Sequence, residues 1–92
     1  MLFHIRWPDG ATERCYSPSL VIKEHLAVGA TYDVAEFLRR SRAALTIASN
    51  RVRERYGFAC SRATGQLARL EAAAARFDAA SNGGVTVVSF EE

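Results

Sequence analysis

The sequence has few of the residues that cross-link a chain or anchor it in a membrane. Its two cysteines, Cys15 and Cys60, are too few for a disulfide framework, and in a reducing cytosol we expect both to be thiols. No apolar run approaches the roughly 20 residues that span a bilayer. The first residues lack the basic region, long apolar core and small-residue cleavage site of a secretion signal. These absences argue against a disulfide-rich, membrane-spanning or secreted protein and predict a cytoplasmic one.

Lysine is also scarce, because Lys23 is the only one and the other eleven basic residues are arginines. Eight of these arginines lie between residues 37 and 69 with a single acidic residue, Glu54, whereas the net charge of the whole chain is only +2. Arginine favours bidentate pairing with carboxylates and phosphates. A GC-rich genome would raise arginine and alanine as well. The composition therefore leaves open a solvated basic face and an anion-binding surface.

Residues 2–17 have the pattern of a β-hairpin, because apolar and polar residues alternate ahead of the turn sequence Pro8-Asp9-Gly10. With a three-residue loop, Phe3 lies opposite Cys15 and the thiol faces the core. With a two-residue loop, His4 lies opposite Cys15 instead. The sequence leaves both registers open, and a slip of one residue reverses every side chain.

Apolar residues recur at three- and four-residue steps over residues 34–56, which predicts a long amphipathic helix between Asp33 as N-cap and Gly57 as C-cap. A second helix is predicted over about residues 62–78, with Ser61 as its cap. The expected inner stripes are Val34, Phe37, Leu38, Ser41, Leu45, Ala48, Val52 and Tyr56 in the first helix, and Ala63, Leu67, Leu70, Ala74 and Phe77 in the second.

The remaining apolar runs predict strands. Residues 20–24 indicate a short third strand, with a short helix as the alternative, and residues 85–90 indicate a C-terminal strand. We therefore expect residues 1–92 to form a single α+β domain, a small and mainly antiparallel sheet with two helices packed on one face. An exposed edge strand at residues 85–90 could pair across a two-fold axis, which makes a second copy of the chain a candidate partner.

Two segments, residues 15–19 and 56–62, combine turn-forming and cap-forming residues with cations, and we expect them to meet in space. A phosphate or carboxylate group near Arg55 and Arg62 would also face backbone N–H groups at the helix start. The same helix start would lower the pKa of the Cys60 thiol. The candidate residues of this docking or anion site are Cys15, Tyr16, Ser17, Arg55, Cys60, Ser61 and Arg62.

Other chemistries receive little support from the residues. No Gly-x-Ser-x-Gly elbow surrounds any serine, so we assign no catalytic residue, and turn bonding and capping account for Ser17, Ser19 and Ser61. The basic face lacks interleaved stacking aromatics, which argues against nucleic-acid binding. The zinc-ligand residue types occur without Cys-x-x-Cys or His-x3-His spacing, so we expect no metal or cofactor; they are His4, Cys15, His25 and Cys60.

Three stretches, residues 15–19, 41–49 and 56–63, resemble a family of small bacterial nitrogen-starvation response proteins. The likeness extends from the Ile5-Arg6-Trp7-Pro8-Asp9-Gly10 segment to the last strand. It implies a cytoplasmic accessory role in scavenging or remodelling nitrogen compounds. It also implies a gene beside a nitrilase, with acetyltransferase-like, radical-SAM-like and flavoprotein-like neighbours, so an enzyme of that cluster is a candidate partner. The family supplies no catalytic residues to carry over.

The sequence thus favours a non-catalytic accessory or binding protein linked to nitrogen-starvation metabolism. The first alternative is a small thiol-dependent enzyme that uses Cys60, activated by the helix start and Arg62. The second is an anion-sensing or regulatory protein that uses the arginine face, formed by Arg39, Arg40, Arg42, Arg51 and Arg53.

Overall fold

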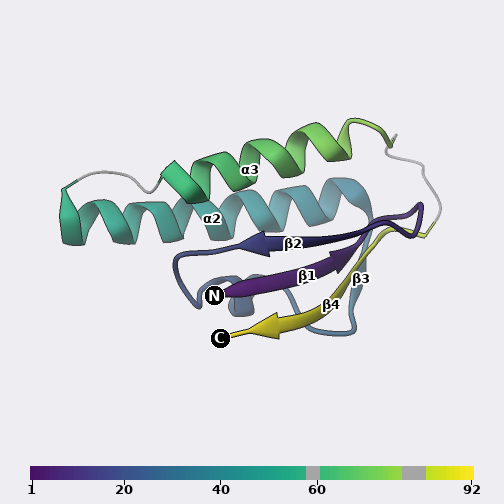
Figure 1. Ribbon diagram of the computed structural model, residues 1–92, viewed down its shortest axis with the longest axis horizontal. Coiled ribbons are helices and arrows are strands. Elements are labelled where there is room, and N and C mark those ends of the chain that lie inside the picture. Colours follow the sequence, from purple (N-terminus) through teal and green to yellow (C-terminus); the bar gives the residue numbers. More distant parts are fainter. Residues whose placement is uncertain (58–60, 78–82) are drawn as a thin grey trace.

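The computed structural model describes residues 1–57, 61–77 and 83–92 of the chain. Within them α2 and α3 lie together on one side of a four-stranded sheet of order β2-β1-β4-β3 (Figure 1). Every strand pair is antiparallel, which confirms the expected α+β class. The elements are β1 (Leu2–Arg6), β2 (Thr12–Tyr16), α1 (Ile22–His25), β3 (Thr31–Tyr32), α2 (Val34–Tyr56), α3 (Ser61–Ala74) and β4 (Val85–Glu91).

The hairpin between β1 and β2 adopts the three-residue loop. The Trp7 N–H donates to the Ala11 carbonyl at 2.8 Å, and Gly10 takes the positive φ of +90° that the last loop position requires. Phe3 consequently lies opposite Cys15, and both side chains are fully buried. The register left open by the sequence is therefore the one that sends the thiol into the core.

The strand predicted over residues 20–24 is wrong, because Ile22–His25 forms the short helix α1 that was its alternative. A helical turn buries Val21, Ile22 and Leu26 together, whereas an alternating strand would expose one of the first two. The additional strand of the sheet is β3, in a segment for which the sequence predicted no strand.

The predicted C-terminal strand is confirmed as β4, but its expected position at an edge of the sheet is wrong. β4 pairs with β1 on one side and with β3 on the other. Two further backbone bonds extend the second pairing, from Gly29 N–H to the Val87 carbonyl at 2.8 Å and from Val87 N–H to the Ala30 carbonyl at 3.0 Å. The outer strands are β2 and β3, so residues 85–87 offer no unpaired edge to a second copy.

The bounds of α2 are those predicted from its caps. The Asp33 carboxylate accepts the Glu36 N–H at 2.7 Å. At the other end, Gly57 adopts a φ of +85° and its N–H donates to the Arg53 carbonyl at 2.8 Å. These local bonds fix both ends of the helix independently of its packing.

The second helix, α3, begins at Ser61, one residue earlier than predicted, and ends at Ala74, earlier than the predicted residue 78, which lies outside the described residues. A tight turn follows, in which the Phe77 N–H donates to the Ala74 carbonyl at 3.0 Å. This turn stacks the Phe77 ring on Trp7, with 5.7 Å between ring centroids. The chain therefore leaves the helix after Ala74, and Phe77 packs on Trp7 from this turn instead of from a last helical turn.

The core lies between the sheet and the two long helices. Trp7 occupies one end of it, edge-on to Phe37 at 5.8 Å. The strands contribute further buried side chains opposite those of α2 and α3. The cluster comprises Phe3, Ile5, Trp7, Cys15, Ile22, Leu26, Val34, Phe37, Ala44, Leu45, Leu70, Ala74, Val85 and Val87.

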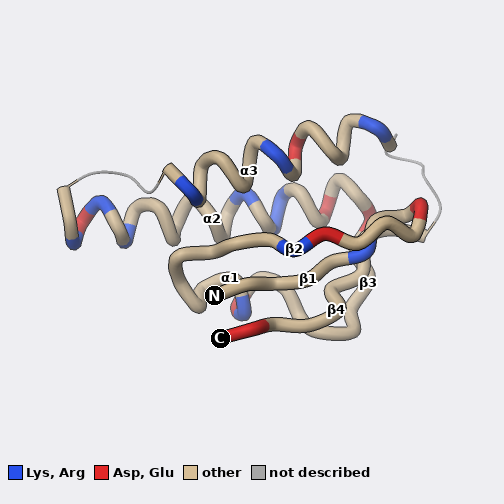
Figure 2. The backbone as a smooth tube through the Cα atoms, in the orientation of Figure 1, with Lys and Arg blue, Asp and Glu red and all other residues tan. Residues whose placement is uncertain are grey.

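α2 extends past the sheet at its C-terminal end (Figure 1). None of its residues after Ser49 is buried. Tyr56, predicted to belong to the inner stripe, is instead 61% exposed, because no strand lies beneath the last turn. Figure 2 shows basic positions gathered on this overhanging end, with one acidic position among them.

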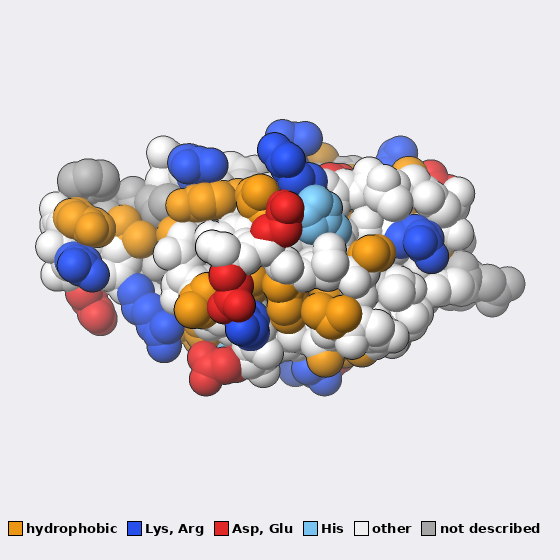
Figure 3. Space-filling view, turned by 60° about the horizontal axis from the view of Figure 1, so that its bottom comes forward, with side chains coloured by type: hydrophobic (Ala, Val, Ile, Leu, Met, Phe, Trp, Pro, Cys, Tyr) orange, Lys and Arg blue, Asp and Glu red, His pale blue; other side chains and the backbone are white. Residues whose placement is uncertain are grey.

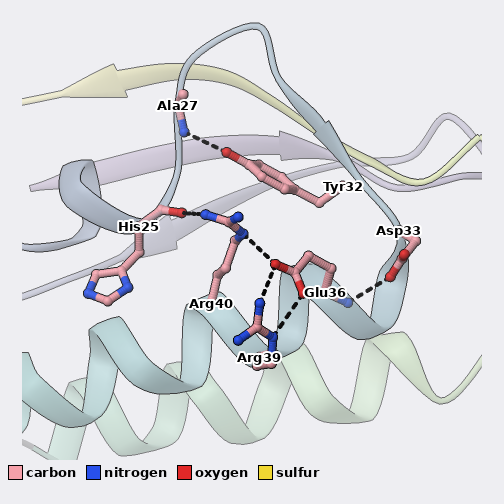
Figure 4. A network of polar contacts seen from close by, with 7 residues as sticks. All are labelled: His25, Ala27, Tyr32, Asp33, Glu36, Arg39 and Arg40. Atoms are coloured by element: carbon pink, nitrogen blue, oxygen red, sulfur yellow. Dashed lines mark hydrogen bonds and ion pairs between the residues drawn. The ribbon is translucent and has the colours of Figure 1, made fainter.

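A network of polar contacts ties the chain before α2 to its first turns (Figure 4). Glu36 receives bonds from Arg39 at 2.6 and 2.9 Å and from Arg40 at 2.8 Å. Arg40 also donates to the His25 carbonyl at 3.0 Å and lies over the Tyr32 ring. The Arg39 hydrogen bond, assisted by that of Arg40, lowers the pKa of the Glu36 carboxyl despite partial desolvation.

This network predicts a pH-dependent contribution to stability. Because the folded-state pKa of Glu36 lies below its unfolded value, its contribution is complete above the ordinary glutamate pKa of about 4.3 and is lost as the pH falls through the lowered pKa. Glu36→Gln should therefore reduce the urea midpoint at pH 7, and its deficit against wild type should shrink in acid. Glu54→Gln, at an exposed position of the same helix, is the control. A Glu36→Gln deficit that is constant from neutral to acid pH would contradict the prediction.

Candidate functional site

The start of α3 lies against the end of β2. The Arg62 guanidinium lies over the Tyr16 ring, 3.8 Å from its centroid. One turn further along α3, the Gln66 side-chain oxygen accepts the Tyr16 N–H at 3.0 Å. The cation–π contact therefore joins Tyr16 of the first segment singled out in the sequence to Arg62 of the second, and the Gln66 bond supports it from the next turn of α3.

The turn after β2 is fixed by its own serines. Ser17 Oγ donates to the Ser19 carbonyl at 2.7 Å and accepts the Ser19 N–H at 3.3 Å. Ser19 Oγ in turn accepts the Val21 N–H at 3.3 Å and an Arg51 guanidinium N–H at 3.1 Å. The turn chemistry expected from Ser17 and Ser19 is present, and it attaches the turn to the side of α2.

Between this turn and the last turns of α2 lies a hollow of about 270 Å³. We call it the α2 hollow; its lining residues are Pro18, Ser19, Ala48, Arg51, Val52, Arg55 and Tyr56. Figure 3 shows basic side chains beside hydrophobic ones at the left end of the molecule, where α2 ends in Figure 1.

A second hollow, of about 450 Å³, lies beside the Tyr16–Arg62 contact. It is open to solvent and its walls carry both signs of charge, from Arg14 and Arg62 and from Glu91 and Glu92. Glu91 is engaged by His4 at 2.8 Å. The lining of this second hollow therefore contains two arginines and two glutamates, so it has no excess of positive charge.

The candidate residues differ in their access to solvent. Cys15 and Ser17 are fully buried, so they can support the surface but cannot contact a partner. Tyr16 is half-buried, and Arg55, Ser61 and Arg62 are exposed. Cys60 lies outside the described residues, and so does any contact between the two thiols.

Burial determines the chemistry of Cys15. It raises the pKa of the thiol, Glu13 raises it further, and Arg69 lowers it by a smaller amount. The thiolate is the nucleophilic form of cysteine, and this environment suppresses it. Cys15 thus acts as the small buried hydrophobe that the sequence suggested.

The arginines expected to form one face of α2 have different partners. Arg39 and Arg40 bind Glu36, Arg42 reaches Glu71 of α3 at 3.4 Å, and Arg53 donates to Asn50 at 3.2 Å. Arg51 turns toward Ser19. Over the described residues the basic side chains are thus distributed around the helix.

Two residues of the site were not singled out from the sequence. Gln66 holds the place of an apolar residue in the stripe, three residues after Ala63 and four before Leu70, and a polar residue at such a position is the signal that a buried hydrogen bond is needed. Arg51 was placed on the solvated face. Its spacing of four from Arg55 puts the two on one side of the helix, but only the packing of the turn shows that this side is partly covered.

The described residues do not gather three or more histidine, cysteine, aspartate or glutamate side chains in a position to hold a metal ion. Within the same part of the chain, no helix combines the length and apolar character needed to cross a membrane.

The fold and the site define a small α+β domain whose exposed arginines and aromatics gather where a tight turn meets two helix ends. A family model described as nitrogen starvation-induced protein NitG matches residues 2–90. The chain belongs to this family, which confirms the resemblance to nitrogen-starvation proteins noted in the sequence. No curated protein and no solved structure matches the chain.

The environment of Cys15 predicts an unreactive thiol. In a Cys60→Ser variant, iodoacetamide should leave Cys15 unmodified in the folded protein and alkylate it fully in denaturant, as followed by intact-mass spectrometry. Raising the pH from 7 to about 9 should change little, because the raised pKa keeps the buried thiol protonated. Alkylation under native conditions at the rate seen in denaturant would show that the thiol is accessible after all.

Proposed function

We propose that this protein is a non-catalytic accessory protein of nitrogen-starvation metabolism, and that it acts by docking a partner enzyme. The docking surface comprises two half-buried residues, Tyr16 and Ser19, and five exposed ones, Leu20, Arg55, Tyr56, Ser61 and Arg62. The observation that carries the proposal is the Arg62–Tyr16 contact of 3.8 Å, because it joins the end of β2 to the start of α3 in one surface.

The composition of this surface supports binding. Arginine and tyrosine are enriched at protein interfaces and are common among the residues that dominate their binding energy. Tyr56 is 61% exposed and Leu20 is 53% exposed, so two large apolar side chains are available beside the arginines. Burying Cys15 removes one candidate nucleophile from the same region.

The charge of the surface specifies the partner's chemistry. Arg51, Arg55 and Arg62 lie on or beside it, so an acidic patch on the partner would be complementary. The resemblance noted in the sequence points to an enzyme encoded in the nitrilase-associated gene cluster as that partner. A cytoplasmic location is part of the same proposal.

The docking proposal is tested by affinity capture from extracts of nitrogen-starved cells that carry this gene, with the tagged chain as bait. Wild type should enrich one defined enzyme over a tag-only bait. Arg62→Gln should lower the affinity of that enzyme about tenfold, because a central arginine of an interface is removed. The affinity is then measured by calorimetry with the purified enzyme.

Arg76→Gln is the matched control. Arg76 is also an exposed arginine over an aromatic ring, that of Phe77, but it lies beyond the opposite end of α3. Its substitution should leave the affinity unchanged. No enrichment over the tag-only bait, or equal losses in the two variants, would exclude docking through this surface.

A further inference from the structure

The α2 hollow differs from the other hollows near it in the balance of its charges. Arg51 and Arg55 line it, and none of its described lining residues is acidic. The hollow beside Tyr16 is lined by glutamates as well as arginines, and a hollow on the last turns of α2 is lined by both Arg53 and Glu54. The hollow between α2 and α3 has no acidic lining residue either, but it has one arginine, Arg53, instead of two. The α2 hollow therefore concentrates positive charge that the described residues around it do not neutralise.

The hollow also presents hydrogen-bond donors in fixed positions. Ser19 Oγ accepts two bonds, from Val21 N–H and from the Arg51 guanidinium, and these occupy its two lone pairs. Neither bond uses the hydroxyl hydrogen. The serine can therefore donate this hydrogen to an acceptor in the hollow, next to the guanidinium of Arg51.

The donors are held before any ligand arrives. The Ser17–Ser19 turn is closed by two hydrogen bonds, and Ser17 is fully buried. Arg51 is held by its bond to Ser19, and Arg55 lies over the Tyr56 ring at 5.7 Å. Side chains that are already restrained lose less conformational entropy on binding.

The rest of the lining comes from the apolar residues Pro18, Ala48 and Val52 and from Tyr56. With a volume of about 270 Å³, the hollow approaches the smaller ligand pockets of proteins, which begin near 300 Å³. A lining that combines two guanidinium groups and a hydroxyl with apolar side chains matches a ligand that has both an anionic and an apolar part.

We infer that the α2 hollow binds a small organic anion through its carboxylate or phosphate group, with Arg51, Arg55 and Ser19 as the donors. The inference rests on the proposed function, since the hollow shares Ser19, Arg55 and Tyr56 with the docking surface, and it adds a ligand class to that surface. A ligand bound there would lie between the arginines and any docked partner.

The test uses the purified full chain and defined probes. Benzoate, acetate and inorganic phosphate are titrated against ¹⁵N-labelled protein by NMR, and benzamide serves as the uncharged analogue of benzoate. We expect saturable shifts of the Arg51 and Arg55 side-chain N–H signals with the anions, none with benzamide, and tighter binding of benzoate than of acetate, because its ring packs on the apolar wall.

Substitutions locate the site. Arg51→Gln and Arg55→Gln should each weaken benzoate binding about tenfold, because each removes a charge-assisted hydrogen bond. Ser19→Ala should weaken it as well, because Arg51 loses its orienting partner. Arg53→Gln is the matched control: it removes the same charge from the same helix, but Arg53 does not line the α2 hollow. Its affinity should equal that of wild type.

The outcomes separate this inference from the docking proposal. Absent shifts, equal shifts with benzamide, or an equal loss in Arg53→Gln would overturn the anion site, even if wild type still captured its enzyme. Saturable benzoate binding that depends on Arg51 and Arg55 would establish the site, even if the capture experiment found no partner. Circular dichroism of each variant verifies that it is folded.

Discussion

The length of α2 relative to the sheet is the constraint on which the rest of the structure depends. A helix of 23 residues extends about 35 Å, whereas strands of five to seven residues extend about 17 to 24 Å. The part of α2 up to Ser49 therefore covers the sheet, with Phe37 and Leu45 among its buried residues, and the part after Ser49 extends past it. Among the described residues, the turn after β2 and the start of α3 lie beside this second part. Their meeting point is the candidate site.

Local signals in the sequence were sufficient for the elements whose bounds are determined by local bonds. Asp33 and Gly57 close α2 through contacts within three or four residues, so both ends could be predicted. The apolar run at residues 20–22 did not distinguish a strand from a helix, because it is too short to show a period. The helix α1 packs against α2, and this tertiary contact favours the helical form. The central place of β4 could not be predicted, because the pairing of Thr31 with Thr86 joins residues far apart in the chain.

The candidate site was predictable to the extent that its residues belong to turns and caps. Tyr16 and Arg62 were selected because they lie beside such features, and the structure places them in contact. Arg51 could not be selected in this way. A helical wheel places Arg51 away from the apolar stripe of α2. The wheel does not show that the Ser17–Ser19 turn packs against this side of the helix. Gln66 was missed because its hydrogen bond to the edge of β2 is visible only in three dimensions.

The way the overhanging end of α2 is stabilised bears on what it can bind. A helical segment of a few turns has little stability of its own in water, and this one lacks a sheet beneath it. The Gly57 cap, the Arg51–Ser19 bond and the continuous helix before it hold it in place. Because these interactions use backbone groups and one guanidinium edge, they leave the Tyr56 ring and the Arg55 side chain exposed. The surface is thus ordered without being covered, so a ligand or partner that binds there need not supply the free energy of ordering the helix.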